Sequence, residues 1–413
     1  MHSFRPYDCE RDRKALQRLW TEIGWIEVDN DGHATALDRF LGAARSLVAE
    51  VNGEAECLVA CCDGSIQHLD DEISMGAVLA VTTSYIARKR GLASSLTAQS
   101  VARDAMAGLA TSALGMFEQG FYSRLGFGTG PYELKAQIDP AQITLPPPQR
   151  EPVRISSADS HAAHRVMMNR LAAHGSVRIH PAAVLQAEMD WTEAPLGLGF
   201  RDDSGNLTHF IWGSCKGEHG PYEINTVAYG TLDQLLELLG LIRSLGDQVL
   251  MAQLQEPAPV QLQDFLRQPF RNQNLSAGGK YAEMVRAEAY WQLRINDLET
   301  CLASTHLRGA DPLAFNLSLH DPIANQLPDD FPWRGISGDY TIELGSQSCA
   351  RKGHSRGLAH MDASVGGFSR LWLGGASATA IAATGELKTS SQKLVSGLER
   401  TLCLPRPRVG WEF

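Results

Sequence analysis

Residues 78–93 read Val-Leu-Ala-Val-Thr-Thr-Ser-Tyr-Ile-Ala-Arg-Lys-Arg-Gly-Leu-Ala, and this stretch decides how the sequence can fold. Its aliphatic and β-branched beginning predicts a strand, and the apolar residues that follow it have helical spacing. Between the two lies a turn with three cations, Arg88, Lys89 and Arg90, which Gly91 closes. The N-terminus of a helix exposes unpaired N–H groups and attracts anions. The stretch therefore predicts a site for a phosphate-bearing ligand.

Small and basic residues around this turn suit a phosphate group. Gly91 lets the backbone approach a ligand closely, and Ala93 keeps the following helix, expected over residues 92–109, near that ligand. The cationic side chains add charge-assisted contacts to a pyrophosphate. A solvated basic turn is the alternative interpretation of the same residues. The neighbouring sequence has to decide between the two.

The sequence on either side of the turn predicts a mixed domain of helices and strands. A helix is expected from residue 15 to residue 20, and glycines at positions 53 and 64 supply turns. Val, Leu and Cys are frequent in the segments expected to form strands. Strands are expected at residues 46–51, 56–62, 75–81 and 113–117. The order is helices, an antiparallel meander, a strand-turn-helix unit and a further strand.

A second motif gives the turn a chemistry. Residues 117–127 read Phe-Glu-Gln-Gly-Phe-Tyr-Ser-Arg-Leu-Gly-Phe. The pattern R-x-x-G-x-A followed by F-Y-x-x-x-G-F resembles the GCN5-related N-acetyltransferase (GNAT) superfamily. That resemblance implies an acyltransferase in which the turn holds the CoA pyrophosphate and Tyr122 lies near the CoA sulfur. A phenol with a pKa of about 10 can protonate a thiolate whose thiol pKa is about 8.5. An aromatic that fills the core is the alternative for Tyr122.

The resemblance also implies acetyl-CoA as co-substrate, no metal, and a set of cofactor contacts. These comprise a strand edge along the pantetheine, a turn around the pyrophosphate and two backbone contacts. The expected residues are Val81, Thr82, Thr83, Arg88, Lys89, Arg90, Gly91, Leu92, Ala93, Ser94, Phe117 and Glu118. The sequence departs from the family at Phe117, where relatives often have serine, and at Tyr85, where they usually have proline. A looser turn is expected from the second departure.

The rest of the chain adds two further blocks. Residues 223–229 and 231–245 again predict strand and helix, but Gly230 stands between them without basic neighbours, so this unit resembles a degenerate GNAT copy. Segments from residue 291 onward are similar to the C-terminal sterol-carrier-like domain of the Eis (enhanced intracellular survival) acetyltransferases. The fold class expected is α/β (α+β), with tandem GNAT folds of mixed, mostly antiparallel sheets and a sterol-carrier-protein-like domain. The expected divisions are 1–144, a proline-rich linker at 145–152, 153–288 and 289–413.

The chain ends in Glu412 and Phe413. In the Eis family the terminus enters the active site, and the resemblance implies that the α-carboxylate of Phe413 accepts the proton of the amine. A carboxylate with a pKa of about 3.3–3.7 is a feeble base, so it could instead act through a water or by holding the ammonium. A disordered tail is the alternative.

The sequence says less about which amine accepts the acetyl group. Trp25, Glu27 and Glu412 are candidate substrate-binding residues, because aromatic and carboxylate groups suit a cationic amine such as a polyamine or an aminoglycoside. Trp20 is expected in the core. A lysyl or N-terminal amine of a protein is an alternative acceptor, and a CoA- or lipid-binding protein with vestigial activity is an alternative function. The resemblance implies a homo-oligomer, as a hexamer.

Composition sets the remaining bounds. The chain has 413 residues, a net charge of −10 and eight scattered cysteines, which favour reduced thiols in a cytoplasmic protein. The acidic balance argues against nucleic acid, whose binding needs clustered Lys and Arg. No apolar run is long enough for a membrane span, and no signal peptide is seen. His161 and His164 lack a third metal ligand.

Overall fold

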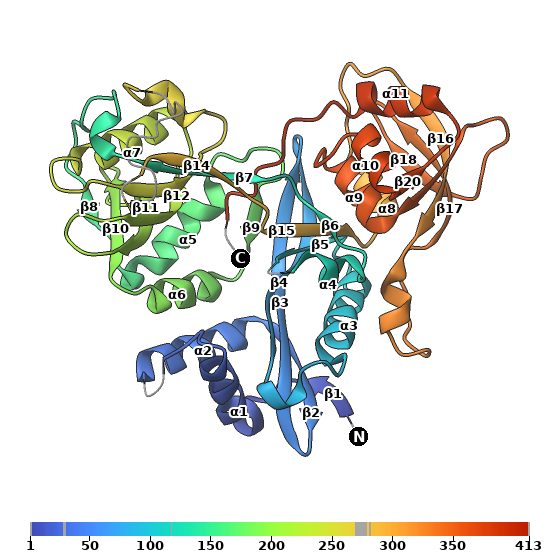
Figure 1. The fold of residues 1–413 in the computed structure, drawn as a ribbon, viewed down its shortest axis with the longest axis horizontal. Helices are drawn as coiled ribbons and strands as arrows, with labels where there is room; N and C mark the ends of the chain where they lie inside the picture. The colour runs from blue at the N-terminus through green and yellow to red at the C-terminus, as the bar shows by residue number, and fades with distance from the viewer. Residues whose placement is uncertain (1, 28–29, 117, 269–278, 281, 412–413) are drawn as a thin grey trace.

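The computed structural model describes residues 2–27, 30–116, 118–268, 279–280 and 282–411. Within them the chain forms three sheets flanked by helices, which Figure 1 shows as three adjoining bodies. The mixed α/β class expected from the sequence is confirmed. None of the described helices is long and apolar enough to cross a bilayer.

The first sheet runs in the order β1-β2-β3-β4-β5-β15-β6, and β9 pairs with β3 beside this path. Its strands are β1 (His2–Pro6), β2 (Arg45–Val51), β3 (Glu54–His68), β4 (Asp71–Thr83), β5 (Thr111–Gly115), β6 (Gly128–Thr129), β9 (Val177–Ile179) and β15 (Trp291–Ile295). Its helices are α1 (Cys9–Glu22), α2 (Asp31–Ala43), α3 (Leu92–Met106), α4 (Gln119–Ser123) and the 3₁₀ turn η1 (Tyr85–Ala87).

Alternation along β3 gives this sheet two buried faces. Leu58 and Ala60 belong to the apolar cluster that contains the helices α1 and α2, whereas Val59 and Cys61 belong to the cluster that contains α3. Successive side chains of a strand point to opposite faces, so an almost continuously apolar strand must be covered on both sides. The sheet is therefore the central layer of the first domain.

The second sheet runs in the order β14-β7-β13-β12-β11-β10-β8. Its strands are β7 (Glu133–Ile138), β8 (Val153–Arg154), β10 (Pro195–Arg201), β11 (Leu207–Cys215), β12 (Tyr222–Ala228), β13 (Ala252–Gln255) and β14 (Met284–Glu288). Its helical segments are η2 (Pro140–Gln142), η3 (Ser157–Asp159), α5 (Ser160–Asn169), α6 (Ala182–Trp191), α7 (Leu232–Ser244) and η4 (Leu262–Phe265).

The third sheet runs in the order β18-β17-β16-β19-β20. Its strands are β16 (Leu313–His320), β17 (Gly338–Leu344), β18 (Cys349–Lys352), β19 (His360–Ser364) and β20 (Leu387–Lys388). Its helices are α8 (Leu298–Ala303), η6 (Pro322–Gln326), α9 (Val365–Trp372), α10 (Ala378–Thr384) and α11 (Gln392–Thr401).

Three strands cross the divisions that the sequence suggested at residues 144 and 288. β7 precedes the first division but pairs with β13 and β14 of the second sheet. β15 follows the second division but pairs with β5 and β6 of the first sheet, and β9 pairs with β3. A strand's apolar pattern gives its burial but not its hydrogen-bond partner. The sheets therefore interlock in a way that local composition does not reveal.

The proline-rich segment 145–152 contains neither helix nor strand. It is nevertheless packed on the second domain. A Cβ added to Gly240 of α7 would lie 2.4 Å from the carbonyl oxygen of Pro146. Arg150 forms an ion pair of 2.5 Å with Glu237 on the same helix. The segment is thus extended but fixed against α7.

Candidate functional site

The strand-turn-helix unit opens where β4 and β5 separate. Their parallel pairing runs from Met75 opposite Thr111 to Val78 opposite Leu114, while β4 continues to Thr83. On its other side β4 stays paired with β3 as far as Thr83. The last residues of β4 therefore present their outer backbone edge to the gap. An extended amide-containing ligand can pair with such an edge.

Backbone conformation fixes the turn that follows. Gly91 is the N-cap of α3 with a φ of 76°, which glycine adopts without strain. A Cβ at this position would meet no atom within 4 Å, so the left-handed backbone, rather than close packing, requires glycine. Lys89 has a φ of 60°. For a residue with a side chain this conformation costs about 1–3 kcal/mol, and residues of this kind cluster at functional sites.

The electrostatic field of the turn is positive. The first turn of α3 contains no acidic residue, and its N-cap offers no side-chain acceptor, so no capping side chain competes with an anion for the N–H groups there. Arg88, Lys89 and Arg90 have exposed side chains around this helix end. The guanidinium of Arg88 lies 5.0 Å from the ring centre of Tyr85.

Tyr85 does not loosen the turn, contrary to the expectation from the missing proline. Its backbone N–H donates to the Glu22 carboxylate at 3.2 Å, and its hydroxyl donates to the Glu22 carbonyl oxygen. Both contacts tie η1 to the end of α1. Side-chain hydrogen bonds thus replace the conformational restriction that proline would have supplied.

A cavity of about 680 Å³ lies over the gap and the turn. It is large enough to bury much of a drug-sized ligand. All the described residues predicted to contact the cofactor through β4, the turn and α3 line it: Val81, Thr82, Thr83, Arg88, Lys89, Arg90, Gly91, Leu92, Ala93 and Ser94. The predicted acceptor residue Trp25 lines the same cavity. The structure therefore brings Trp25 together with the predicted cofactor residues of β4, the turn and α3.

Tyr122 lies on α4 and is 2% exposed. It belongs to the buried cluster that contains Val78 of β4 and Leu96 of α3, and its ring is 4.8 Å from that of Phe121, which lines the cavity. Burial raises the pKa of the Tyr122 phenol above its usual value. The group therefore stays protonated at neutral pH, as a proton donor requires, but it is a weaker acid than a phenol in water.

Two other predicted residues have local structural contacts. The carboxylate of Glu118 caps α4 by accepting from the Gly120 N–H at 2.9 Å. Glu27 is exposed, and its carboxylate accepts from the amide of Asn30 at 2.8 Å. Neither is among the described residues that line the cavity. Trp20 is 4% exposed and packs edge-on against Trp25 at 5.0 Å, so the expected core position holds.

Three predicted site residues, Phe117, Glu412 and Phe413, lie outside the described residues. The chain just before the last two is firmly placed. Trp411 is 4% exposed, and its ring lies 5.6 Å from the Arg170 guanidinium and 6.5 Å from the His164 ring. The described end therefore packs between α5 and β9 rather than extending into solvent.

Sequence reasoning missed part of the cavity wall. Ile23, Ala87, Phe121 and Arg124 also line it. Phe121 and Arg124 are spaced i, i+3, and the guanidinium lies 5.9 Å from the Phe121 ring centre. That spacing places two side chains on one helical face, so the signal was present beside Tyr122. Arg124 adds a fourth cation to the mouth of the site.

An open strand edge, a helix N-terminus without a side-chain cap and a cluster of cations meet beside a cavity on a mixed α/β fold. Comparison with known proteins gives the class: residues 14–130 match the family described as acetyltransferase (GNAT) domain. The protein is therefore an acyltransferase with a GNAT acetyltransferase domain, which implies acetyl-CoA as co-substrate.

Solved structures share the complete fold. A probable N-acyltransferase from Enterococcus faecalis V583 superposes with a TM-score of 0.79 at 18% identity, covering 100% of both chains. A GCN5-related N-acetyltransferase from Anabaena variabilis gives 0.77 at 13%, and Eis1 from Mycobacterium abscessus gives 0.73 at 16%, each over 100% of both chains. No curated protein matches the sequence. At these identities the structures show likeness of fold alone.

Nowhere in the described residues do three or more His, Cys, Asp or Glu side chains gather in a group suited to a metal ion.

Proposed function

We propose that the protein moves the acetyl group of acetyl-CoA to a primary amine of a cationic small molecule, such as a polyamine or an aminoglycoside. The observation that carries this proposal is the cavity at the β4–α3 turn. There an open strand edge, the uncapped N-terminus of α3 and the exposed cations Arg88, Lys89 and Arg90 meet in one space.

Different groups of residues would bind different parts of CoA. The turn would hold the pyrophosphate through the helix N–H groups and charge-assisted contacts. The outer edge of Val81–Thr83 would pair with the amides of the pantetheine, and the backbone of Phe117 and Glu118 would complete the CoA contacts. The strand edge, the turn and the N-terminus of α3 line one cavity, so a single extended ligand would satisfy these three groups together.

The reaction would proceed by direct attack. The amine nitrogen adds to the thioester carbon, the carbon–sulfur bond breaks, and the thiolate takes the proton of the Tyr122 phenol. The α-carboxylate of Phe413 would take the amine's proton through a water or hold the ammonium before attack. No covalent intermediate with the protein is needed, because donor and acceptor occupy one cavity.

The acceptor would lie against aromatic surface. Trp25 is 47% exposed at the cavity wall, so its ring face is available to a cation. Glu27 and Glu412 would add carboxylates at the entrance. A lysyl or N-terminal amine of a protein is the alternative acceptor with the same chemistry.

A thiol-release screen tests the function. Purified protein is incubated with acetyl-CoA and polyamines, aminoglycosides or lysine peptides, and free CoA is measured with a thiol reagent. Release with the cationic small molecules is expected. Release with peptides only would move the acceptor to proteins, and binding of acetyl-CoA without release from any amine would favour a vestigial CoA-binding protein.

The assignment to the Eis type belongs to the same proposal. The third sheet with α8–α11 would be the sterol-carrier-like domain, and the active form would be a homo-hexamer. Light scattering after size-exclusion chromatography tests the assembly, with a mass of six 45.0 kDa chains expected.

A further inference from the structure

The second domain repeats the strand geometry of the first. β12 and β13 are parallel and pair from Tyr222 opposite Ala252 to Ile224 opposite Leu254, while β12 continues to Ala228. α7 joins them, as α3 joins β4 to β5. A gap therefore opens at the same place in both units. We call the gap beside β12 and β13 the second slot.

The second slot cannot accept a pyrophosphate as the first does. The N-cap of α7 is Thr231, whose hydroxyl accepts from the Gln234 N–H, and Asp233 places a negative charge in the first turn. The Gly230 N–H donates to the Gln234 side chain at 2.7 Å. These contacts occupy donors that a phosphate would need, and the carboxylate would repel it.

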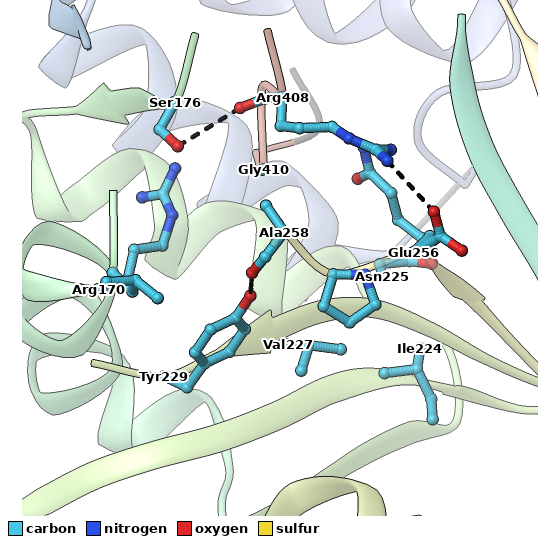
Figure 2. Close-up of a pocket in the computed structure, with 13 residues that line it drawn as sticks. Arg170, Ser176, Ile224, Asn225, Val227, Tyr229, Glu256, Ala258, Arg408 and Gly410 are labelled. Carbon is cyan, nitrogen blue, oxygen red and sulfur yellow. Dashed lines mark hydrogen bonds and ion pairs between the residues drawn. The ribbon is translucent and has the colours of Figure 1, made fainter. Parts of the chain in front are cut away.

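The second slot is also nearly full. The space left in it is about 60 Å³, against about 680 Å³ in the first. Part of its wall comes from the far end of the chain, namely Arg408 and Gly410 (Figure 2). Figure 2 also shows the Tyr229 hydroxyl bonded to the Ala258 carbonyl across the slot.

The segment 406–411, which we call the tail, is held there by backbone and charge. The Arg408 N–H donates to the His174 carbonyl oxygen at 2.8 Å, and the Val409 carbonyl oxygen accepts from the Val177 N–H at 2.9 Å. The Arg408 guanidinium lies 3.2 Å from the Glu256 carboxylate and 3.7 Å from that of Glu133. Both carboxylates are at most 9% exposed, so these ion pairs are largely shielded from water.

Steric fit adds to these bonds. Gly175 has a φ of 84°, and a Cβ built there would lie 2.8 Å from the Cα of Pro407 and 2.9 Å from the N of Arg408. The tail therefore passes against a backbone that has no room for a side chain. A close approach of this kind is the arrangement expected of a bound peptide strand.

We infer that the second slot is a receptor for the chain's own tail, and that Arg408 is the positioning residue that fixes it. The second unit thus keeps the strand geometry of a cofactor slot but binds a peptide segment in place of a nucleotide. Because Val409 is bonded to β9 and Trp411 packs against His164 of α5, the slot sets the starting point for the residues that follow. This last step rests on the proposed role of the Phe413 carboxylate.

The test measures tail retention and turnover separately. Full-length protein is treated with a broad-specificity carboxypeptidase and followed by intact mass. In wild type, removal of residues from the C-terminus is expected to stop before Trp411 is released. In Arg408→Ala and in Gly175→Ala, digestion is expected to continue past Trp411. The kcat of both variants should fall about 100-fold, which is the cost of a misplacement of about 1 Å. Their KM for acetyl-CoA should change less than about twofold.

A control and a second test variant complete the experiment. Arg400→Ala removes an exposed cation on α11, outside the tail and the slot, and should behave as wild type. Glu256→Gln keeps an acceptor oxygen for the Leu262 N–H, which now donates to Glu256 at 3.1 Å, and should loosen the tail without leaving an unpaired buried charge. If Arg408→Ala fails to fold, Glu256→Gln carries the test.

The outcomes separate the inference from the proposed function. The tail could resist digestion in Arg408→Ala, Gly175→Ala and Glu256→Gln as well as it does in wild type. That result would overturn the inference that the second slot holds the tail. A released tail with unchanged kcat would overturn the positioning role. If wild type releases no CoA with any amine, the proposed function fails, and the digestion still decides whether the slot holds the tail.

Discussion

A buried ion pair joins the third domain to the helix that carries Tyr122. Its removal should lower both the stability of the protein and its turnover. The guanidinium of Arg294 on β15 lies 2.7 Å from the Asp321 carboxylate, with both side chains 0% exposed. Arg294 also donates to the carbonyl oxygen of Leu125, just after α4, and to the Asn296 side chain at 3.0 Å. Arg294→Met would leave Asp321 charged, buried and without its cation.

The size of the effect follows from these contacts. Breaking a buried pair by removing one partner costs about 3–5 kcal/mol. The entropy of unfolding is about 2.1 cal/mol/K per residue, or about 0.9 kcal/mol/K for 413 residues, so Tm should fall by about 3–6 °C. Turnover at 25 °C should also fall by about tenfold, because the segment after Tyr122 loses an anchor.

Scanning calorimetry and the thiol assay measure the two effects. Arg308→Met is the matched control, since its 3.1 Å pair with Asp70 is exposed, at 82% and 73%, and should shift Tm by less than about 1 °C. The double variant Arg294→Met/Asp321→Asn should regain only part of the loss. Asp321 accepts from the Ile323 and Ile336 N–H groups at 3.1 and 3.0 Å, and asparagine offers one oxygen in place of two. A single variant with unchanged Tm would refute the reasoning.

Three other outcomes are expected. Tyr122→Phe should lower kcat about 10²–10⁴-fold and leave the acetyl-CoA Kd from calorimetry within about twofold; turnover like that of wild type would remove its acid role. Lys89→Ala/Arg90→Ala should raise that Kd at least about tenfold and weaken its dependence on salt, and an unchanged Kd would place the phosphates elsewhere. Burial lowers the pKa of His68 to about 3, so its contribution to stability is complete above about pH 6.5 and is lost as pH falls toward 3. Urea midpoints across that range should be less pH-dependent in His68→Gln; an identical pH dependence would contradict this.

The strand-turn-helix unit was predictable because its signals are local. The aliphatic run that ends at Thr83, the three cations and Gly91 follow one another directly, and the left-handed φ of 76° is the conformation for which glycine is selected. The part of the cavity wall formed by Phe121 and Arg124 was not predicted, although its i, i+3 spacing beside Tyr122 is an equally local signal. Most of the cavity lining falls within residues 81–94, whereas Trp25 and Arg124 come from distant segments of the chain.

Long-range partners were not predictable. Nothing in the composition of β15 shows that it pairs with β5, whose residues precede it by more than a hundred positions. Arg408 likewise looks like any arginine of a terminal segment until Glu133 and Glu256 are seen around it. Charge and periodicity restrict which faces are buried, but strand partners and ion pairs depend on how distant segments meet. Interlocking of the domains is therefore a result of the structure alone.

The two slots show that strand geometry alone does not make a cofactor site. Both units separate two parallel strands beside the N-terminus of a helix, so the backbone offers the same opening twice. At Gly91 the helix end is free of acidic and capping side chains and is ringed by cations, whereas Thr231 and Asp233 cap and neutralise the other. A helix end without free N–H donors binds an anion weakly. The second opening is therefore available to a peptide segment with a cationic side chain, here Arg408. Few changes at a helix N-terminus are thus enough to convert one kind of slot into the other.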